Sequence, residues 1–167
     1  VRLFEVGRSF HRDPAGAPVA GYRPPWRLSG LAYGGALPEG WGADARRVDF
    51  FDVKGDLEAL LAPAELYFER LTHPALHPGR AARILLAGAE IGCLGELHPE
   101  WVQKYELPFP PVVFELDFAA ITAAAVPAYK EVSRFPPVIR DLAVVVDQDL
   151  SLQALLDTLR PDRKSTR

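Results

Sequence analysis

The sequence lacks methionine, holds a single cysteine and contains no long apolar run. One cysteine, Cys93, cannot form an internal disulfide, and a small buried thiol in a strand is favoured over a nucleophile. A membrane-spanning helix needs about 18–20 apolar residues, and the sequence shows neither such a run nor a charged-then-apolar leader. We therefore expect a protein of the reducing cytoplasm that is neither exported nor embedded in a membrane.

The absence of methionine also bears on the extent of the chain, which opens on Val1 inside a pattern typical of a strand. A complete translation product needs an initiator, so we expect a piece of a larger polypeptide. Any catalytic apparatus of that parent can therefore lie outside these residues.

A strong excess of one charge is also lacking, because 19 Lys and Arg stand against 22 Asp and Glu, for a net charge of −3. Residues 1–128 carry 12 basic and 16 acidic side chains, and residues 129–167 carry 7 and 6. A stand-alone nucleic-acid-binding protein usually clusters Lys and Arg against phosphates. Composition alone therefore does not predict one.

The 167 residues are 49% hydrophobic and 25% charged, which is ordinary for a globular domain. This length supports one core, or one core with a partial second one. Alternating or β-branched runs predict an antiparallel sheet with helices on one side, which is an α+β fold. The expected strands cover residues 2–10, 26–33, 65–71, 83–86, 90–94, 112–116 and 141–146, and the expected helices cover 48–62, 99–105 and 151–160.

Turn and packing signals add detail to this pattern. Residues 2–10 and 26–33 are expected to form a hairpin with a long tip, and Gly88-Ala89 to form a tight turn. In the helix at 48–62, an apolar stripe is predicted on one face, and the interior Gly55 is expected to pack closely against a sheet. The residues of this predicted stripe are Phe51, Leu57, Leu60 and Leu61.

Several polar groups could carry chemistry, yet each has a simpler structural interpretation. His73 and His77 have the spacing of helical metal ligands, but the prolines beside them favour a turn with hydrogen bonds to the backbone. We expect no metal site. Glu96, His98 and Glu100 could form an acid–base set, although capping of the following helix is favoured. Asp49 and Asp52 are likewise expected to stabilise a helix N-terminus.

Five phrases in a fixed order carry a family resemblance. They are residues 3–8 (LFEVGR), 48–55 (VDFFDVKG), 75–79 (ALHPG), 95–100 (GELHPE) and 134–141 (RFPPVIRD). Together they resemble the C-terminal half of the β subunit of bacterial phenylalanyl-tRNA synthetase, over about residues 1–160.

The resemblance implies a domain organisation. Residues 1–127 would form a class II synthetase-like, non-catalytic module. Residues 128–160 would open a ferredoxin-fold anticodon-binding domain that remains incomplete, and residues 161–167 would be an unmatched polar tail.

The resemblance also implies a function. The parent complex, a cytoplasmic (αβ)2 heterotetramer, would attach phenylalanine to tRNA(Phe) with ATP and magnesium, with the chemistry on the α subunit. The β module would be a structural partner that binds no cofactor itself. Residues 10–13 (FHRD) depart from the Phe-Arg-x-Glu of an active relative, and a Gly-x-Gly-x-x-Glu-Arg stretch is missing. No catalytic residue is therefore assigned, and the fragment is expected to be inactive.

For RNA binding, the resemblance points to Arg134, Phe135 and Arg140. Arginines would contact phosphates, and an exposed aromatic ring would stack on an unpaired base. Packing of Phe135 in a core is the competing interpretation. Two other functions stay open from the sequence, which are an autonomous RNA-binding module and an active class II-like ligase.

Overall fold

The structure is a computed structural model, and it describes residues 1–15, 21–38, 40–42, 45–123, 136, 139, 141 and 143–159. The chain divides into two units, residues 1–128 and 129–167.

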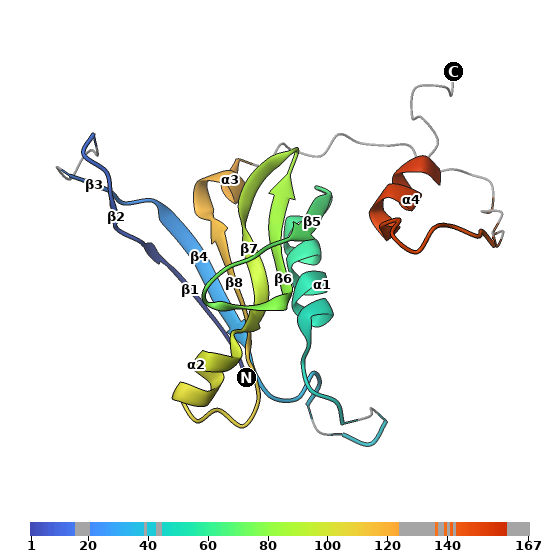
Figure 1. Cartoon of the computed structure of the whole chain (residues 1–167), viewed down its shortest axis with the longest axis horizontal. Helices are drawn as coiled ribbons and strands as arrows, with labels where there is room; N and C mark the ends of the chain where they lie inside the picture. Colours follow the sequence, from blue (N-terminus) through green and yellow to red (C-terminus); the bar gives the residue numbers. More distant parts are fainter. Residues whose placement is uncertain are drawn as a thin grey trace. The chain divides into compact units, whose positions relative to one another are not determined.

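The first unit contains a six-stranded sheet in which every neighbouring pair is antiparallel (Figure 1). This confirms the expected antiparallel α+β arrangement. In spatial order, its strands are β1 (Arg2–Arg8), β4 (Trp26–Ala32), β8 (Val112–Asp117), β7 (Ala89–Leu97), β6 (Leu76–Leu86) and β5 (Leu66–Arg70).

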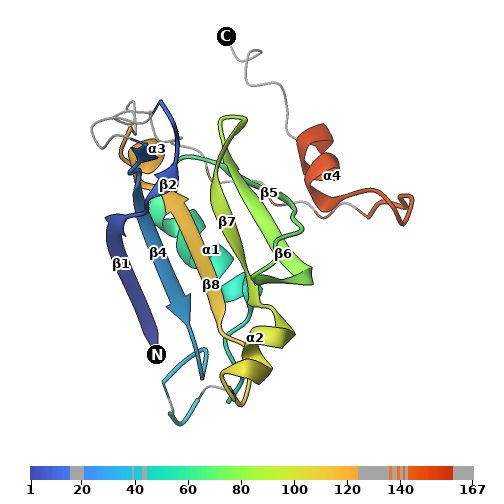
Figure 2. The same cartoon turned by 60° about the vertical axis from the view of Figure 1, so that its left-hand side comes forward.

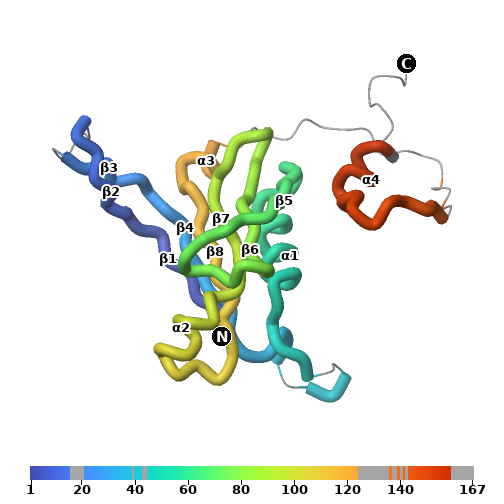
Figure 3. Tube along the Cα trace, in the orientation of Figure 1, coloured from blue at the N-terminus to red at the C-terminus, as the bar shows by residue number. Residues whose placement is uncertain are grey.

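Strands β1 and β4 form the predicted hairpin, with Leu3 opposite Leu31 and Phe4 opposite Gly30. The hairpin continues past the sheet as a second, two-stranded ribbon of β2 (His11–Arg12) and β3 (Tyr22–Arg23). Figures 1 and 3 show this ribbon projecting beyond the end of the large sheet. The expected long tip is therefore confirmed.

Helix α1 (Phe50–Leu61) covers one face of the sheet (Figure 2). Asp49 caps it, because its carboxylate accepts the backbone N–H of Phe51 and Asp52 and the Asp52 carboxylate accepts the N–H of Asp49. Reciprocal bonds of this kind satisfy N–H groups that have no partner inside the helix. The predicted N-terminal role of these two aspartates is thus confirmed.

The predicted apolar stripe of α1 is partly wrong. Val53 and Leu57 are buried and Leu61 packs against the core, whereas Phe51 and Leu60 remain 75% and 57% exposed. The helical period explains the difference. The side chains that face the sheet recur every three to four residues, and this series begins at Phe50, one residue before the Phe51 of the predicted stripe. The buried residues facing α1 from the sheet are Ile84, Leu94, Val112 and Leu116.

The expectation for Gly55 is also wrong. Gly55 is exposed, and a Cβ added there would have no atom within 4 Å apart from its own helix backbone and chain neighbours. It lies on the side of the helix away from the buried Val53 and Leu57. Close packing against the sheet therefore does not explain this glycine.

Strand β6 is longer than predicted and begins at Leu76, because a register shift between Leu76 and Ala81 accommodates the proline and glycine of this stretch. The tight turn to β7 is formed by Ala87 and Gly88, both with positive φ, one residue before the predicted position. Two consecutive positive φ values suit the twist of a two-residue hairpin.

Two short helices complete the first unit, α2 (Pro99–Lys104) and α3 (Phe118–Thr122). In the second unit, α4 (Leu152–Leu159) confirms the predicted helix, and the Ser151 hydroxyl accepts the N–H of Ala154. The strand expected at 141–146 is absent from its described residues, 141 and 143–146. A strand needs a hydrogen-bonded neighbour, and the described part of this unit contains no other strand.

Candidate functional site

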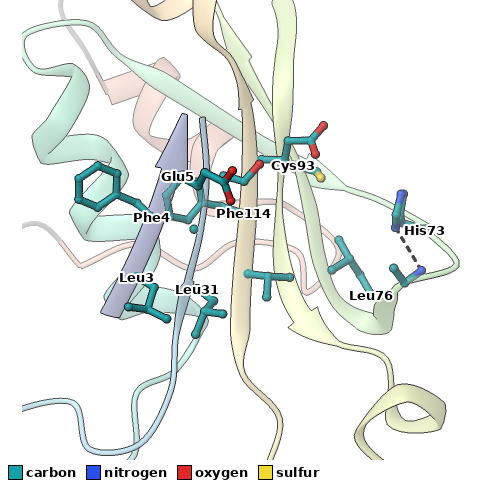
Figure 4. Close-up of a pocket in the computed structure, with 13 residues that line it drawn as sticks. Leu3, Phe4, Glu5, Leu31, His73, Leu76, Cys93 and Phe114 are labelled. Atoms are coloured by element: carbon teal, nitrogen blue, oxygen red, sulfur yellow. Dashed lines mark hydrogen bonds between the residues drawn. The ribbon is translucent and has the colours of Figure 1, made fainter. Parts of the chain in front are cut away.

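A cavity of about 640 Å³ lies over β1, β4, β8 and β7, on the face of the sheet opposite α1 (Figure 4). Alternation along the strands places Val113 and Cys93 on this face, since Val112 and Leu94 point into the core beneath α1. Leu3 and Leu31, paired across β1 and β4, also line the cavity. The cavity is thus lined largely by apolar side chains.

The charges in this cavity are acidic. Glu5 and Glu115 line it, and none of its lining residues, all of them described, is an arginine or lysine. The neighbouring Arg27 lies between two carboxylates, with Nη1 3.5 Å from Asp117 Oδ2 and Nε 3.6 Å from Glu115 Oε1. Carboxylates repel phosphate, so these residues do not fit a nucleoside triphosphate.

Cys93 lines the same cavity from β7 and is partly buried. Burial raises the pKa of its thiol above the ordinary value, and the negative charge of Glu115 raises it further. A raised pKa keeps the thiol protonated, whereas the thiolate is the nucleophilic form. The position in a strand matches the expectation of an unreactive thiol.

The two histidines that could have formed a metal site bind the backbone instead. Nδ1 of His73 accepts the N–H of Ala75 at 3.2 Å (Figure 4), and Nδ1 of His77 accepts the N–H of Gly79 at 3.0 Å. The predicted backbone bonds are confirmed, although His77 lies in β6 rather than in a turn. Within the described residues, no group of three or more His, Cys, Asp or Glu could hold a metal ion.

The segment with Glu96, His98 and Glu100 has structural contacts rather than those of an acid–base set. Nδ1 of His98 accepts the N–H of Glu100 at 3.2 Å and caps α2, as predicted. Glu96 is buried and binds Arg80 across the β6–β7 pair, at 2.8 Å and 3.1 Å from Nη1. The sequence did not reveal this ion pair.

The predicted RNA-binding residues Arg134, Phe135 and Arg140 lie outside the described residues, so they stay predictions. Arg12 belongs to residues 10–13 (FHRD), which depart from the Phe-Arg-x-Glu of an active relative. Its side chain is exposed in β2.

The structure also contains an apolar surface whose location the sequence did not indicate. A groove of about 340 Å³ runs between the edge strand β1 and helix α1, and it is lined almost entirely by apolar side chains. Phe4 and Leu60 line it and are 79% and 57% exposed. Arg2 and Asp56 line it as well, and their ion pair at 3.6 Å joins the strand to the helix. The alternating pattern of residues 2–10 was the available signal, because it predicts two distinct faces for this strand.

In the described residues, no helix is long and apolar enough to cross a membrane. Among solved structures, one similar chain is a pyrrolysyl-tRNA synthetase from Desulfitobacterium hafniense. It is 17% identical with a TM-score of 0.46, and the match covers 73% of this chain and 40% of that one.

Comparison with known sequences gives closer matches. The chain is 72% identical over 160 residues to the phenylalanine–tRNA ligase beta subunit of Dechloromonas aromatica and 60% identical over 161 residues to that of Ralstonia nicotianae. These alignments cover 96% and 94% of this chain and 20% of each relative, so the chain spans about a fifth of their length. Residues 1–118 match the family described as the phenylalanyl tRNA synthetase beta chain CLM domain. The chain therefore belongs to this family.

Proposed function

We propose that this chain is a structural, non-catalytic part of the β subunit of phenylalanine–tRNA ligase, which supports attachment of phenylalanine to tRNA(Phe) by packing against the α subunit. The observation that carries the proposal is the apolar groove between β1 and α1. Family membership supplies the identity of the partner, and the groove supplies a surface on which a partner can pack.

The groove has the properties of a protein contact. Phe4 and Leu60 expose most of their side-chain surface to water, and burial of apolar surface stabilises an association by about 25 cal/mol per Å². Strand β1 is at the end of the sheet order, and within the described residues its outer edge has no strand partner. An exposed edge next to apolar side chains is a surface that proteins usually cover.

The cavity on the other face supports a non-catalytic role. Its carboxylates and the absence of an arginine or lysine among its lining residues disfavour ATP in this cavity. This supports the proposal that the fragment itself binds no cofactor. ATP and magnesium belong to the parent complex, an (αβ)2 assembly of the cytoplasm with the chemistry on the α subunit. An active class II-like ligase is disfavoured on the same grounds.

Co-expression of this chain with the α subunit of the Dechloromonas aromatica enzyme tests the proposal. The α subunit should co-purify with the chain, and Phe4→Ser with Leu60→Ser should reduce the amount retained by tenfold or more, on the order expected for two lost apolar anchors. Tyr105→Ser is the matched control, because Tyr105 is 62% exposed and does not line the groove. Equal retention by the groove variant and the control would contradict this role for the groove.

A further inference from the structure

The ribbon formed by β2 and β3, with the adjoining ends of β1 and β4, differs in charge from the rest of the chain. Residues 8–27 contain four arginines and one aspartate, which gives a net charge of +3, in a protein of net charge −3. We call the described part of this segment, residues 8–15 and 21–27, the basic hairpin. Pairing of His11 with Arg23 and of Arg12 with Tyr22 brings its two halves together.

Three of its arginines are available for a ligand. Arg8, Arg12 and Arg23 are exposed, and none of them has a carboxylate within 4.0 Å among the described residues. By contrast, Arg80 and Arg83 of the central sheet each form an ion pair at 2.8–2.9 Å. Unlike Arg27, which pairs with Glu115 and Asp117, these three cations of the basic hairpin are not neutralised by neighbours in the described structure.

The same hairpin exposes three aromatic rings. Phe10, Tyr22 and Trp26 are 63%, 38% and 45% exposed. The guanidinium of Arg8 lies 4.9 Å from the centre of the Trp26 ring, so a cation and a ring share one surface. None of these rings belongs to the core cluster or to the partly buried side chains packed on it. Core packing therefore does not explain their positions.

Unpaired guanidinium groups interleaved with exposed rings are the chemistry that binds single-stranded nucleic acid. Arginines contact backbone phosphates, and each ring offers a face on which an unstacked base can lie. A duplex keeps its bases stacked and cannot use the rings in this way. An acidic protein surface would match the charge but would not require three exposed rings.

We propose that the basic hairpin is an RNA-binding site for unpaired nucleotides, with the three arginines on phosphates and the three rings stacked on bases. The proposal rests on the proposed function only for the identity of the natural RNA, which would be an unpaired segment of tRNA(Phe). It does not involve residues 128–160, where the family resemblance predicts RNA binding.

Fluorescence anisotropy with a labelled short single-stranded RNA, and with the same RNA annealed to its complement, tests the proposal on this chain. The single strand should bind more tightly than the duplex. Arg12→Gln with Arg23→Gln should weaken binding and reduce the magnitude of the slope of log K against log salt by about 0.7 for each arginine. The matched control removes two exposed cations elsewhere, with Arg70→Gln and Lys104→Gln, and should leave the slope unchanged.

A second variant separates stacking from charge. Phe10→Ala should weaken single-strand binding on the order of tenfold without changing the salt slope, whereas Trp41→Ala, at a fully exposed ring outside the hairpin, should have no effect. Equal binding by the arginine variant and its control, an absence of RNA binding, or binding of poly-glutamate in place of RNA would each overturn the proposal. Because the Arg12 and Arg23 variants leave the β1–α1 groove intact, retention of the α subunit tests the proposed function separately.

Discussion

Arg80 Nη1 lies 2.8 Å and 3.1 Å from the two carboxylate oxygens of Glu96, whose side chain is only 11% exposed. The pair joins β6 to β7 where their register shifts. Replacement of Arg80 by Met would leave a buried carboxylate without its partner. We expect the free energy of unfolding to fall by about 1–3 kcal/mol, measured by urea denaturation.

The matched control for this prediction is Arg83→Met. Arg83 forms a similar ion pair with Glu69 at 2.9 Å, but both side chains are substantially exposed, at 44% and 54%. Exposed pairs contribute about 0–1 kcal/mol. Equal losses of stability in the two variants would show that the burial of Glu96 does not strengthen its pair with Arg80.

The capping box of α1 predicts a dependence of stability on pH. Hydrogen bonds from Arg46, at 2.6 Å and 2.7 Å, and from the backbone N–H of Asp49 lower the pKa of Asp52 to about 2. The unfolded value is about 3.9. Since the folded pKa is the lower one, this stabilisation is present above about pH 4 and is lost as the pH falls towards 2.

Asp52→Asn should therefore lower the free energy of unfolding at neutral pH. The difference in this free energy between the variant and the parent chain should shrink as the pH falls from about 4 to about 2. Urea denaturation at a series of pH values measures this. Asp56→Asn is the control, because Asp56 is 55% exposed and its pair with Arg2 is longer, at 3.6 Å. A difference that stays constant across this pH range would contradict the assignment.

Two glycines should respond to alanine in opposite ways. A Cβ at Gly92 in β7 would collide with the carbonyl oxygen of Glu115 in β8, so Gly92→Ala should lower stability by about 1–3 kcal/mol or more. Gly55 has open space inside α1, and Gly55→Ala should raise stability by about 1 kcal/mol. Thermal melting of both variants checks the pair, and a loss of stability in the Gly55 variant would show that its surroundings are not open.

The exposed groove also predicts self-association of the isolated chain. Apolar surface of this kind rarely remains solvated, so light scattering at high concentration should give a mass above the 18.4 kDa of one chain. Phe4→Ser with Leu60→Ser should lower that mass. A parent chain that stays monomeric at all concentrations would count against the groove as a contact surface.

Features set by neighbouring residues were predictable from the sequence. The caps at Asp49, His98 and Ser151 each bind a backbone N–H two or three residues further along the chain. Such bonds depend on local chemistry that a short phrase contains. The alternating strands and the long hairpin were predictable for the same reason.

Features that depend on residues far apart in the sequence could not be predicted in this way. The pairing of Glu96 with Arg80 depends on the register of two strands, and the inward face of α1 was misplaced by one position because Phe50 and Phe51 fit the apolar pattern equally well. Charge averaged over residues 1–128 concealed the basic hairpin. Folding brings Arg12 and Arg23 together from either side of a long loop.

We propose above that this chain is a non-catalytic partner of the α subunit and does not itself bind ATP. Calorimetric titration of the chain, with the α subunit in one experiment and with ATP and magnesium in another, distinguishes such a partner from an ATP-binding enzyme. We expect saturable binding of the α subunit and no binding heat with ATP. Saturable ATP binding together with no binding of the α subunit would contradict it.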